Sequence, residues 1–139
     1  MENRTSITVE TTVNTPVEKV WQYWSAPEHI TKWTFASGDW HVPYADNDLK
    51  TGGKFKTTMA AKDGSEGFDF EGTYSAVEEN KLIEYNMADG RQVKITFEEN
   101  DGKTRIVETF DAEEQNSVEM QKNGWQSILD NFKKYTEEN

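Results

Sequence analysis

Glu108 is the residue of this chain with the clearest potential for chemistry. It shares one side of an expected strand with Ile106 and Phe110, because alternate residues of a strand point to the same face. If these two apolar side chains face the interior, the carboxyl group does so too, and burial raises the pKa of a carboxyl group. Such a group could bind a polar part of a ligand or act as a general acid or base. The alternative is that Val107 and Thr109 face inward and Glu108 is solvated, and the sequence leaves both arrangements open.

Other catalytic and metal-binding patterns are weak. The chain has no cysteine, which excludes a thiol nucleophile, a disulfide and a thiolate metal site. His29 is expected to be solvated on a helix, whereas His41 follows Trp40 and could reach the mouth of a cavity. Residues 46–48 begin like a calcium loop, but the glycine and the later acidic residue that such a loop requires are missing. We therefore predict no metal and no cofactor.

Charge and hydropathy restrict the classes of partner. The 26 acidic and 15 basic residues give a net charge of -11, which argues against binding to nucleic acid or to anionic lipid, because both need a basic surface. No apolar run reaches the roughly 18 residues of a membrane span, so no membrane insertion is expected. Residues 1–6 are polar and do not resemble a signal peptide. These features predict a soluble, cytoplasmic protein.

The last part of the chain is the element that must enclose any interior site. Apolar residues recur at spacings of three and four over residues 117–136, which predicts a long amphipathic helix. Asn116 is the expected N-cap, because Glu119 three residues later completes a capping-box pattern. Gly124 lies inside this helix beside Trp125, where glycine costs about 1 kcal/mol relative to alanine. Either the glycine leaves room for a ligand, or it lets a strand or ring approach closely.

The first part of the chain predicts one strand and two short helices. Residues 7–13 alternate apolar with polar side chains, as in a half-buried strand. Thr15 suits the N-cap of a helix that begins at Pro16, and Pro27 opens a second short helix. Residues 34–48 predict an irregular segment, because glycine, proline and the acidic residues at its end interrupt every period.

A series of strands without helical interruption follows. Strands are predicted at residues 54–61, 68–74, 82–87, 93–97 and 104–110, separated by turns rich in Asp, Asn and Gly. One strand, two helices, an antiparallel meander and a long final helix form an α+β plan in a single domain of residues 1–139. The curved sheet is expected to wrap around the C-terminal helix, which must bury its apolar stripe on the concave face.

Five short patterns occur along the chain in a characteristic order and spacing. They are Thr15-Pro16-Val17-Glu18-Lys19-Val20-Trp21, Pro27-Glu28-His29-Ile30-Thr31-Lys32-Trp33, Asp48-Leu49-Lys50-Thr51-Gly52-Gly53-Lys54-Phe55, Gly72-Thr73-Tyr74 with Lys81-Leu82-Ile83, and Gly124-Trp125 with Leu129-Asp130. Together they resemble the START-related superfamily (SRPBCC, birch-pollen-allergen-like), which has the helix-grip fold. Within it they are similar to the branch called activator of heat shock protein 90 ATPase homologue-like.

The resemblance implies a cavity between the sheet and the C-terminal helix. We expect it to bind a small hydrophobic or amphipathic molecule, such as a lipid, an aromatic compound or a polyketide-like compound, without catalysing a reaction. Many aromatic side chains with few convergent polar groups are the usual composition of such a pocket. The candidate lining residues are Trp33, Phe35, Phe55, Phe70, Tyr85, Phe97, Glu108, Met120, Gly124 and Trp125.

Two other classes of function are kept as alternatives. The family's chaperone stimulators suggest a co-chaperone-like interaction domain with a place in the stress response, although they usually carry an additional N-terminal domain that residues 1–139 do not include. A cyclase- or hydrolase-type enzyme could use Glu108, together with His41, through a bound water molecule. The strand edges of an open sheet are compatible with a monomer or a dimer.

Overall fold

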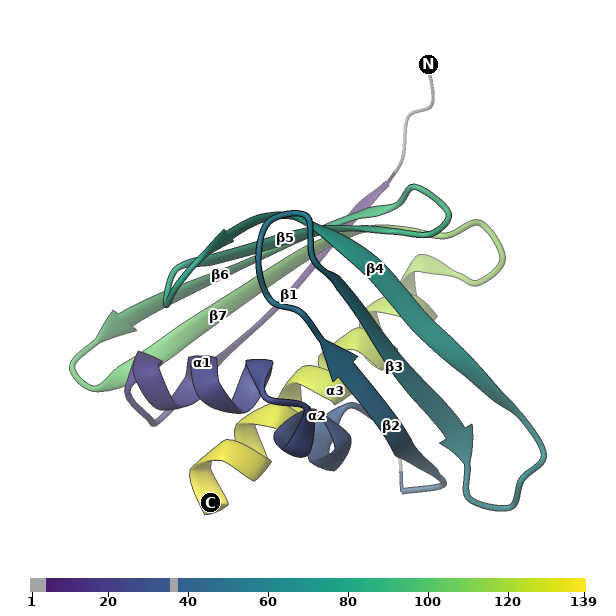
Figure 1. Cartoon of the computed structure of the whole chain (residues 1–139), viewed down its shortest axis with the longest axis horizontal. Helices are drawn as coiled ribbons and strands as arrows, with labels where there is room; N and C mark the ends of the chain where they lie inside the picture. Colours follow the sequence, from purple (N-terminus) through teal and green to yellow (C-terminus); the bar gives the residue numbers. More distant parts are fainter. Residues whose placement is uncertain (1–4, 36–37) are drawn as a thin grey trace.

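A seven-stranded antiparallel sheet curves around a long C-terminal helix (Figure 1). This computed structural model describes residues 5–35 and 38–139. The signal-peptide prediction for residues 1–6 and the irregular segment predicted at residues 34–48 therefore lie partly outside the described residues. The arrangement is the predicted α+β helix-grip fold.

The element order is that of the predicted plan with one additional strand. The strands are β1 (Ser6–Val13), β2 (Trp40–Asn47), β3 (Lys54–Ala61), β4 (Gly67–Glu78), β5 (Leu82–Met87), β6 (Gln92–Asn100) and β7 (Lys103–Asp111). The helices are α1 (Val17–Ser25), α2 (Pro27–Trp33) and α3 (Val118–Glu138). The strand order is β1-β7-β6-β5-β4-β3-β2, so consecutive strands from β2 to β7 are neighbours. The connection through α1 and α2 carries the chain from one edge of the sheet to the other.

The inward face of the sheet follows from strand alternation and register. Ile106, Glu108 and Phe110 on β7 are all buried. Glu108 pairs with Val9 on one side and with Ile95 on the other, and both of these residues are buried as well. The register therefore places the carboxyl group of Glu108 on the same face of the sheet as the aliphatic core. This is the inward arrangement, one of the two that the sequence left open.

Strand β2 shows that the prediction of an irregular segment was wrong for residues 40–47. It pairs with β3 only and forms an edge of the sheet. Proline is tolerated at an edge, because its missing N–H would face solvent rather than a neighbouring strand. The register with β3 shifts between His41 and Tyr44, on either side of Pro43. The interrupted sequence pattern reflects this shift in register. The segment is nevertheless a strand, because it pairs with β3.

The N-terminus of α3 is capped by Ser117, so the predicted cap at Asn116 was wrong. The Ser117 hydroxyl oxygen accepts a hydrogen bond from the backbone N–H of Met120, at 3.1 Å. Asn116 instead donates hydrogen bonds from its backbone N–H and from its amide group to the carboxylate of Glu113. It thereby shapes the turn before the helix.

Helix α1 begins at Val17, one residue later than predicted, and its cap is not local. Pro16 is the N-cap residue and makes no side-chain cap bond. The backbone N–H of Val17 donates to the carboxylate of Glu99 at the end of β6, at 2.8 Å. The predicted cap, Thr15, is buried, and its carbonyl oxygen accepts a hydrogen bond from the hydroxyl of Thr104. A residue distant in the sequence therefore supplies the capping group.

Over residues 5–35 and 38–139, no helix has both the length and the apolar character needed to cross a membrane.

Replacing Ser117 by alanine should lower the free energy of unfolding by about 1 kcal/mol, because the N–H of Met120 loses its cap. The matched control is Asn116→Ala, which removes the residue that sequence reasoning favoured as the cap and should cost less. Urea unfolding followed by circular dichroism measures both values. A larger loss for Asn116→Ala would contradict the assignment of the cap.

Candidate functional site

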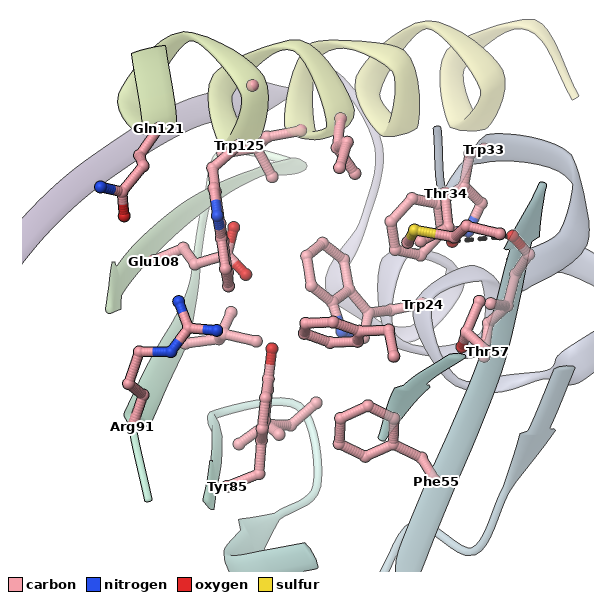
Figure 2. Close-up of a pocket in the computed structure, with 18 of the residues that line it drawn as sticks. Trp24, Trp33, Thr34, Phe55, Thr57, Tyr85, Arg91, Glu108, Gln121 and Trp125 are labelled. Atoms are coloured by element: carbon pink, nitrogen blue, oxygen red, sulfur yellow. Dashed lines mark hydrogen bonds between the residues drawn. The ribbon is translucent and has the colours of Figure 1, made fainter. Parts of the chain in front are cut away.

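A cavity of about 420 Å³ lies between α3 and the concave face of the sheet (Figure 2). Its lining comes from all three helices and from strands β2 to β7. Most of the lining is apolar, and the aromatic contributors are Trp24, Trp33, Phe55, Phe68, Phe70, Tyr74, Tyr85 and Trp125. The cavity is thus lined mainly by rings and aliphatic side chains, with polar side chains among them.

Three aromatic contacts, at two places along α3, join this helix to β7 and to the two short helices. Trp125 stacks on Phe110 of β7 with ring centroids 3.8 Å apart and planes inclined by 11°. Further along α3, Phe132 packs edge-on against Trp33 of α2 at 4.7 Å and Trp24 of α1 at 4.9 Å. Rings at these two places, Trp125 and the pair Trp24 and Trp33, also line the cavity.

Eight of the ten residues predicted to line a site do line this cavity. They are Trp33, Phe55, Phe70, Tyr85, Glu108, Met120, Gly124 and Trp125. Their role in binding a ligand stays a prediction. Phe97 lies outside the lining because Trp21 and Trp24 cover its ring, at 5.3 and 5.6 Å between centroids. Phe35, which is half-buried after the end of α2, also lies outside the lining.

Sequence reasoning missed several residues that contribute to the site. Trp24 lines the cavity from α1, and its sequence pattern gave no indication that it would do so. Thr57 and Tyr74 lie on faces of strands that alternation predicts to point inward, and this signal could have found them. Arg91 follows an Asp-Gly turn, where a charged residue is normally solvated, and only the fold brings it to the cavity.

Gly124 leaves open space on its helix. A Cβ atom built at this position would have no heavy atom within 4 Å among the described residues, apart from its immediate helical neighbours. The alternative explanation, a strand or ring in close approach, is therefore wrong. Gly72 on β4 is the residue where close approach occurs, since a Cβ there would lie 2.6 Å from the ring of Phe55.

Glu108 is the principal ionisable group of the cavity. Its side chain lines the cavity and the residue is only 6% exposed, so the inward arrangement considered for this residue is correct. Burial raises the pKa of the Glu108 carboxyl group to about 8. Within the described part of the chain this group makes no hydrogen bond and no ion pair, so nothing offsets the cost of its burial in the charged form. At neutral pH the carboxyl group is therefore mainly protonated.

Tyr85 and Arg91 lie at the same end of the cavity as Glu108 (Figure 2). Burial raises the pKa of the Tyr85 hydroxyl well above its usual value, the nearby Glu108 raises it further, and Arg91 lowers it. Arg91 is held by Asp89, whose carboxylate accepts hydrogen bonds from the Arg91 Nε at 2.7 Å and from its backbone N–H at 3.1 Å. This part of the cavity therefore combines a carboxyl group, a phenol and a guanidinium group.

Other polar lining residues are already occupied by the protein. Gln121 accepts a hydrogen bond from the backbone N–H of Glu113 and donates to the carbonyl oxygens of Glu113 and Asn116. The Tyr74 hydroxyl donates to the side-chain oxygen of Asn47, and burial raises the pKa of this hydroxyl. These residues hold the walls of the cavity in place rather than offering free groups to its interior.

Neither histidine belongs to the site. His41 is exposed on the edge strand β2, so a catalytic role beside Glu108 is not supported. His29 is half-buried rather than solvated as predicted: its ring stacks on Tyr23 at 4.0 Å, and its Nδ1 lies 2.7 Å from the hydroxyl of Tyr135. This contact joins α2 to the C-terminal part of α3. In the described ranges, no three His, Cys, Asp or Glu residues are grouped in a way that could hold a metal ion.

Comparison with known proteins identifies similar sequences and structures. The family model for Activator of Hsp90 ATPase homolog 1-like protein matches residues 14–137. The solution structure of the AHSA1-like protein from Aeromonas hydrophila is 45% identical, with a TM-score of 0.91, over 96% of this chain and 93% of that chain. Chr148 from Cytophaga hutchinsonii is 59% identical, with a TM-score of 0.83 and the same coverage of 96% and 93%. No curated protein matches the chain.

A more distant structure has the same fold. Protein NE0264 from Nitrosomonas europaea is 19% identical over 99% of this chain and 97% of that chain, with a TM-score of 0.82. At this identity, the similarity shows the architecture alone.

Replacing Glu108 by glutamine should remove a pH dependence of stability. The usual pKa of 4.5 applies to the unfolded chain and about 8 to the folded protein, so below pH 4.5 both states are protonated. Between these values the folded protein binds more protons, and the free energy of unfolding falls as the pH rises, by up to about 1.4 kcal/mol per pH unit. Urea unfolding across this pH range should show a smaller fall for Glu108→Gln than for the wild type.

The matched control for this titration is Glu71→Gln, which neutralises an exposed carboxylate on β4. It should keep the pH dependence of the wild type. Identical slopes for the wild type and Glu108→Gln would show that the carboxyl group is not protonated in the folded protein.

Replacing Gly124 by alanine should raise the free energy of unfolding by about 1 kcal/mol, because alanine is the better helix former and its Cβ meets open space. The matched control is Gly72→Ala, whose Cβ would collide with the ring of Phe55 and should lower stability by about 1–3 kcal/mol. Urea unfolding of both variants tests the comparison. Destabilisation by Gly124→Ala would mean that the space beside the glycine is filled.

Proposed function

Because the chain belongs to the Activator of Hsp90 ATPase homolog 1-like family, we propose that it binds an apolar or amphipathic small molecule between α3 and the sheet. Membership of this family supports a START/SRPBCC-type domain that is either ligand-binding or co-chaperone-like. The binding of a small molecule is the more specific statement, and it depends on the character of the cavity.

The single observation that carries this proposal is the ring-lined cavity of about 420 Å³. Pockets for small molecules usually measure about 300–1,000 Å³ and combine an apolar wall with a few placed polar groups. Packed protein interiors contain few voids larger than a water molecule, so a cavity of this size is not expected from packing alone. Lipids, aromatic compounds and polyketide-like compounds have the apolar surface that such walls would cover.

A reaction is the second candidate, and one observation favours it. Glu108 is a protonated carboxylic acid within the cavity, which is a suitable state for a general acid near neutral pH. A second catalytic group beside it would strengthen this candidate, but His41 is exposed on the edge strand. Binding without catalysis therefore remains the function that we favour.

Native mass spectrometry of the freshly purified protein tests the proposal directly. We expect an adduct that is lost on denaturation and whose mass corresponds to a small organic molecule. The neutral fluorescent probe N-phenylnaphthylamine provides a second test, because its emission rises when it enters an apolar cavity. Absence of both the adduct and the rise in emission would contradict the proposal.

Replacing Thr57 by phenylalanine should weaken binding of N-phenylnaphthylamine at least tenfold. Thr57 is buried on β3 and lines the cavity, so the added ring would occupy part of its volume. The matched control is Thr58→Phe on the same strand, where the side chain points to the other face and bonds to Asp69. This control should bind the probe like the wild type. Equal weakening by both substitutions would show that the probe binds elsewhere.

A further inference from the structure

We propose that the ligand carries a carboxylate head group, which Arg91, Tyr85 and Trp125 bind at one end of the cavity while its apolar tail lies among the rings at the other. This inference rests on the proposed function and specifies the chemistry of the ligand. It follows from the uneven distribution of hydrogen-bond donors and acceptors along the cavity.

The two ends of the cavity differ in character. Figure 2 shows Arg91, Glu108, Tyr85 and Trp125 gathered on one side, with the polar atoms of these side chains directed inward. The opposite side carries the rings of Trp24, Trp33 and Phe55 together with Thr34 and Thr57, and the Thr34 hydroxyl already donates to the carbonyl oxygen of Ile30. A ligand that satisfies both ends must itself be amphipathic.

Arg91 brings a guanidinium group to the polar end, where it forms an ion pair with Asp89 at 2.7 Å. Asp89 binds its Nε and its backbone N–H and thereby fixes the orientation of the guanidinium group. The two terminal amino groups, Nη1 and Nη2, make no hydrogen bond to any residue that the structure describes. Two parallel N–H donors on one guanidinium group match the two oxygens of a carboxylate. Glu108 does not form an ion pair with Arg91, although both residues line the cavity.

Tyr85 and Trp125 add two further donors. The Tyr85 hydroxyl and the Trp125 indole N–H have no hydrogen-bond partner in the described part of the protein. The rings of Tyr85 and Trp125 both pack edge-on against the ring of Phe70, with 6.2 Å between ring centroids in each pair. An indole nitrogen can only donate, and the phenol stays protonated because burial raises its pKa. The polar end therefore offers donors from two opposite walls, β5 and α3.

The acceptors that the described residues bring to this end are largely engaged, and the Glu113 carboxylate accepts two hydrogen bonds from Asn116. The side-chain oxygen of Gln121 already accepts a hydrogen bond from Glu113. Glu108 is mainly protonated near neutral pH, so its carboxyl group can donate as well as accept. A cationic head group would face Arg91 and would require Glu108 to ionise where burial disfavours the charge. An alcohol would satisfy only part of the donors, and buried donors without partners are costly. A carboxylate accepts from all of them.

Matched aromatic probes test this inference. Naphthylacetic acid, naphthylethanol and naphthylethylamine share a ring system and differ in the head group. Isothermal titration calorimetry at pH 7 should show the acid binding at least tenfold more tightly than the alcohol and the amine. Equal affinities of all three would overturn the head-group inference and leave the proposed function standing. Absence of binding by all three would overturn both.

Substitution of Arg91 tests where the head group binds. Arg91→Gln should reduce the affinity for the acid about tenfold or more and leave the affinity for the alcohol almost unchanged. The matched control is Arg105→Gln on β7, because Arg105 is exposed and pairs with Glu10 outside the cavity. It should bind all three probes like the wild type. Equal losses in the two variants would show that the acid responds to overall charge rather than to a site at Arg91.

The pH dependence of binding tests the part played by Glu108. Affinity for the acid should fall as the pH rises through about 8, because ionised Glu108 would repel the carboxylate. The other titratable groups that line the cavity within the described ranges are Tyr74, Tyr85, Arg91 and Glu113, and α3 contributes none. Glu108→Gln keeps a donor at this position and should make the affinity nearly independent of pH. A fall of the same size in Glu108→Gln would overturn the role assigned to this carboxyl group.

Discussion

The structure depends on how α3 is supported above the sheet. The helix must bury an apolar stripe, in which Leu129 and Phe132 are fully buried. Ring contacts add to this burial: Trp125 stacks on Phe110, and Phe132 packs against Trp24 and Trp33. Aromatic pairs of this kind contribute about 0.5–1.5 kcal/mol beyond the area they bury. Because these supports stand near β7 at one place and on α1 and α2 at another, the helix does not have to fill the interval between them. The cavity is a consequence of this spacing.

A carboxyl group in that interval changes what the cavity can accept. Strand register directs Glu108 inward beside Val9 and Ile95, and burial makes its neutral form the stable one near pH 7. The cavity then contains several neutral donors and a guanidinium group that is paired with Asp89, and the Glu113 carboxyl group of the lining accepts hydrogen bonds from Asn116. Burial of this carboxyl group lowers the free energy of unfolding as the pH rises. A role of Glu108 in ligand recognition would account for a destabilising group at this position. Stability and ligand choice are linked through one residue.

Much of the architecture could be predicted from the sequence because it is encoded in local patterns. The long helix, the meander and the two short helices follow from periodicity and turn residues. Two errors occurred where a distant residue takes over a local role: Glu99 caps α1, and β3 pairs with β2 despite Pro43. Local propensity cannot identify these partners. The third error is a local shift by one residue, because Ser117 rather than the neighbouring Asn116 caps α3.

The candidate site divides in the same way. Alternation and helical spacing predicted that Phe55, Phe70 and Trp125 would face one interior, since a side chain's direction follows from its place in a strand or helix. For Glu108 they left two arrangements open, and the register of β7 with β1 and β6 decided for the inward one. Only the tertiary structure decided that Arg91, which follows an Asp-Gly turn of a kind normally exposed to solvent, reaches this interior. It also decided that Trp21 and Trp24 cover the ring of Phe97. The physical reason is that these positions depend on contacts between aromatic side chains. The contacts join residues that are far apart in the chain, so local sequence patterns do not reveal them.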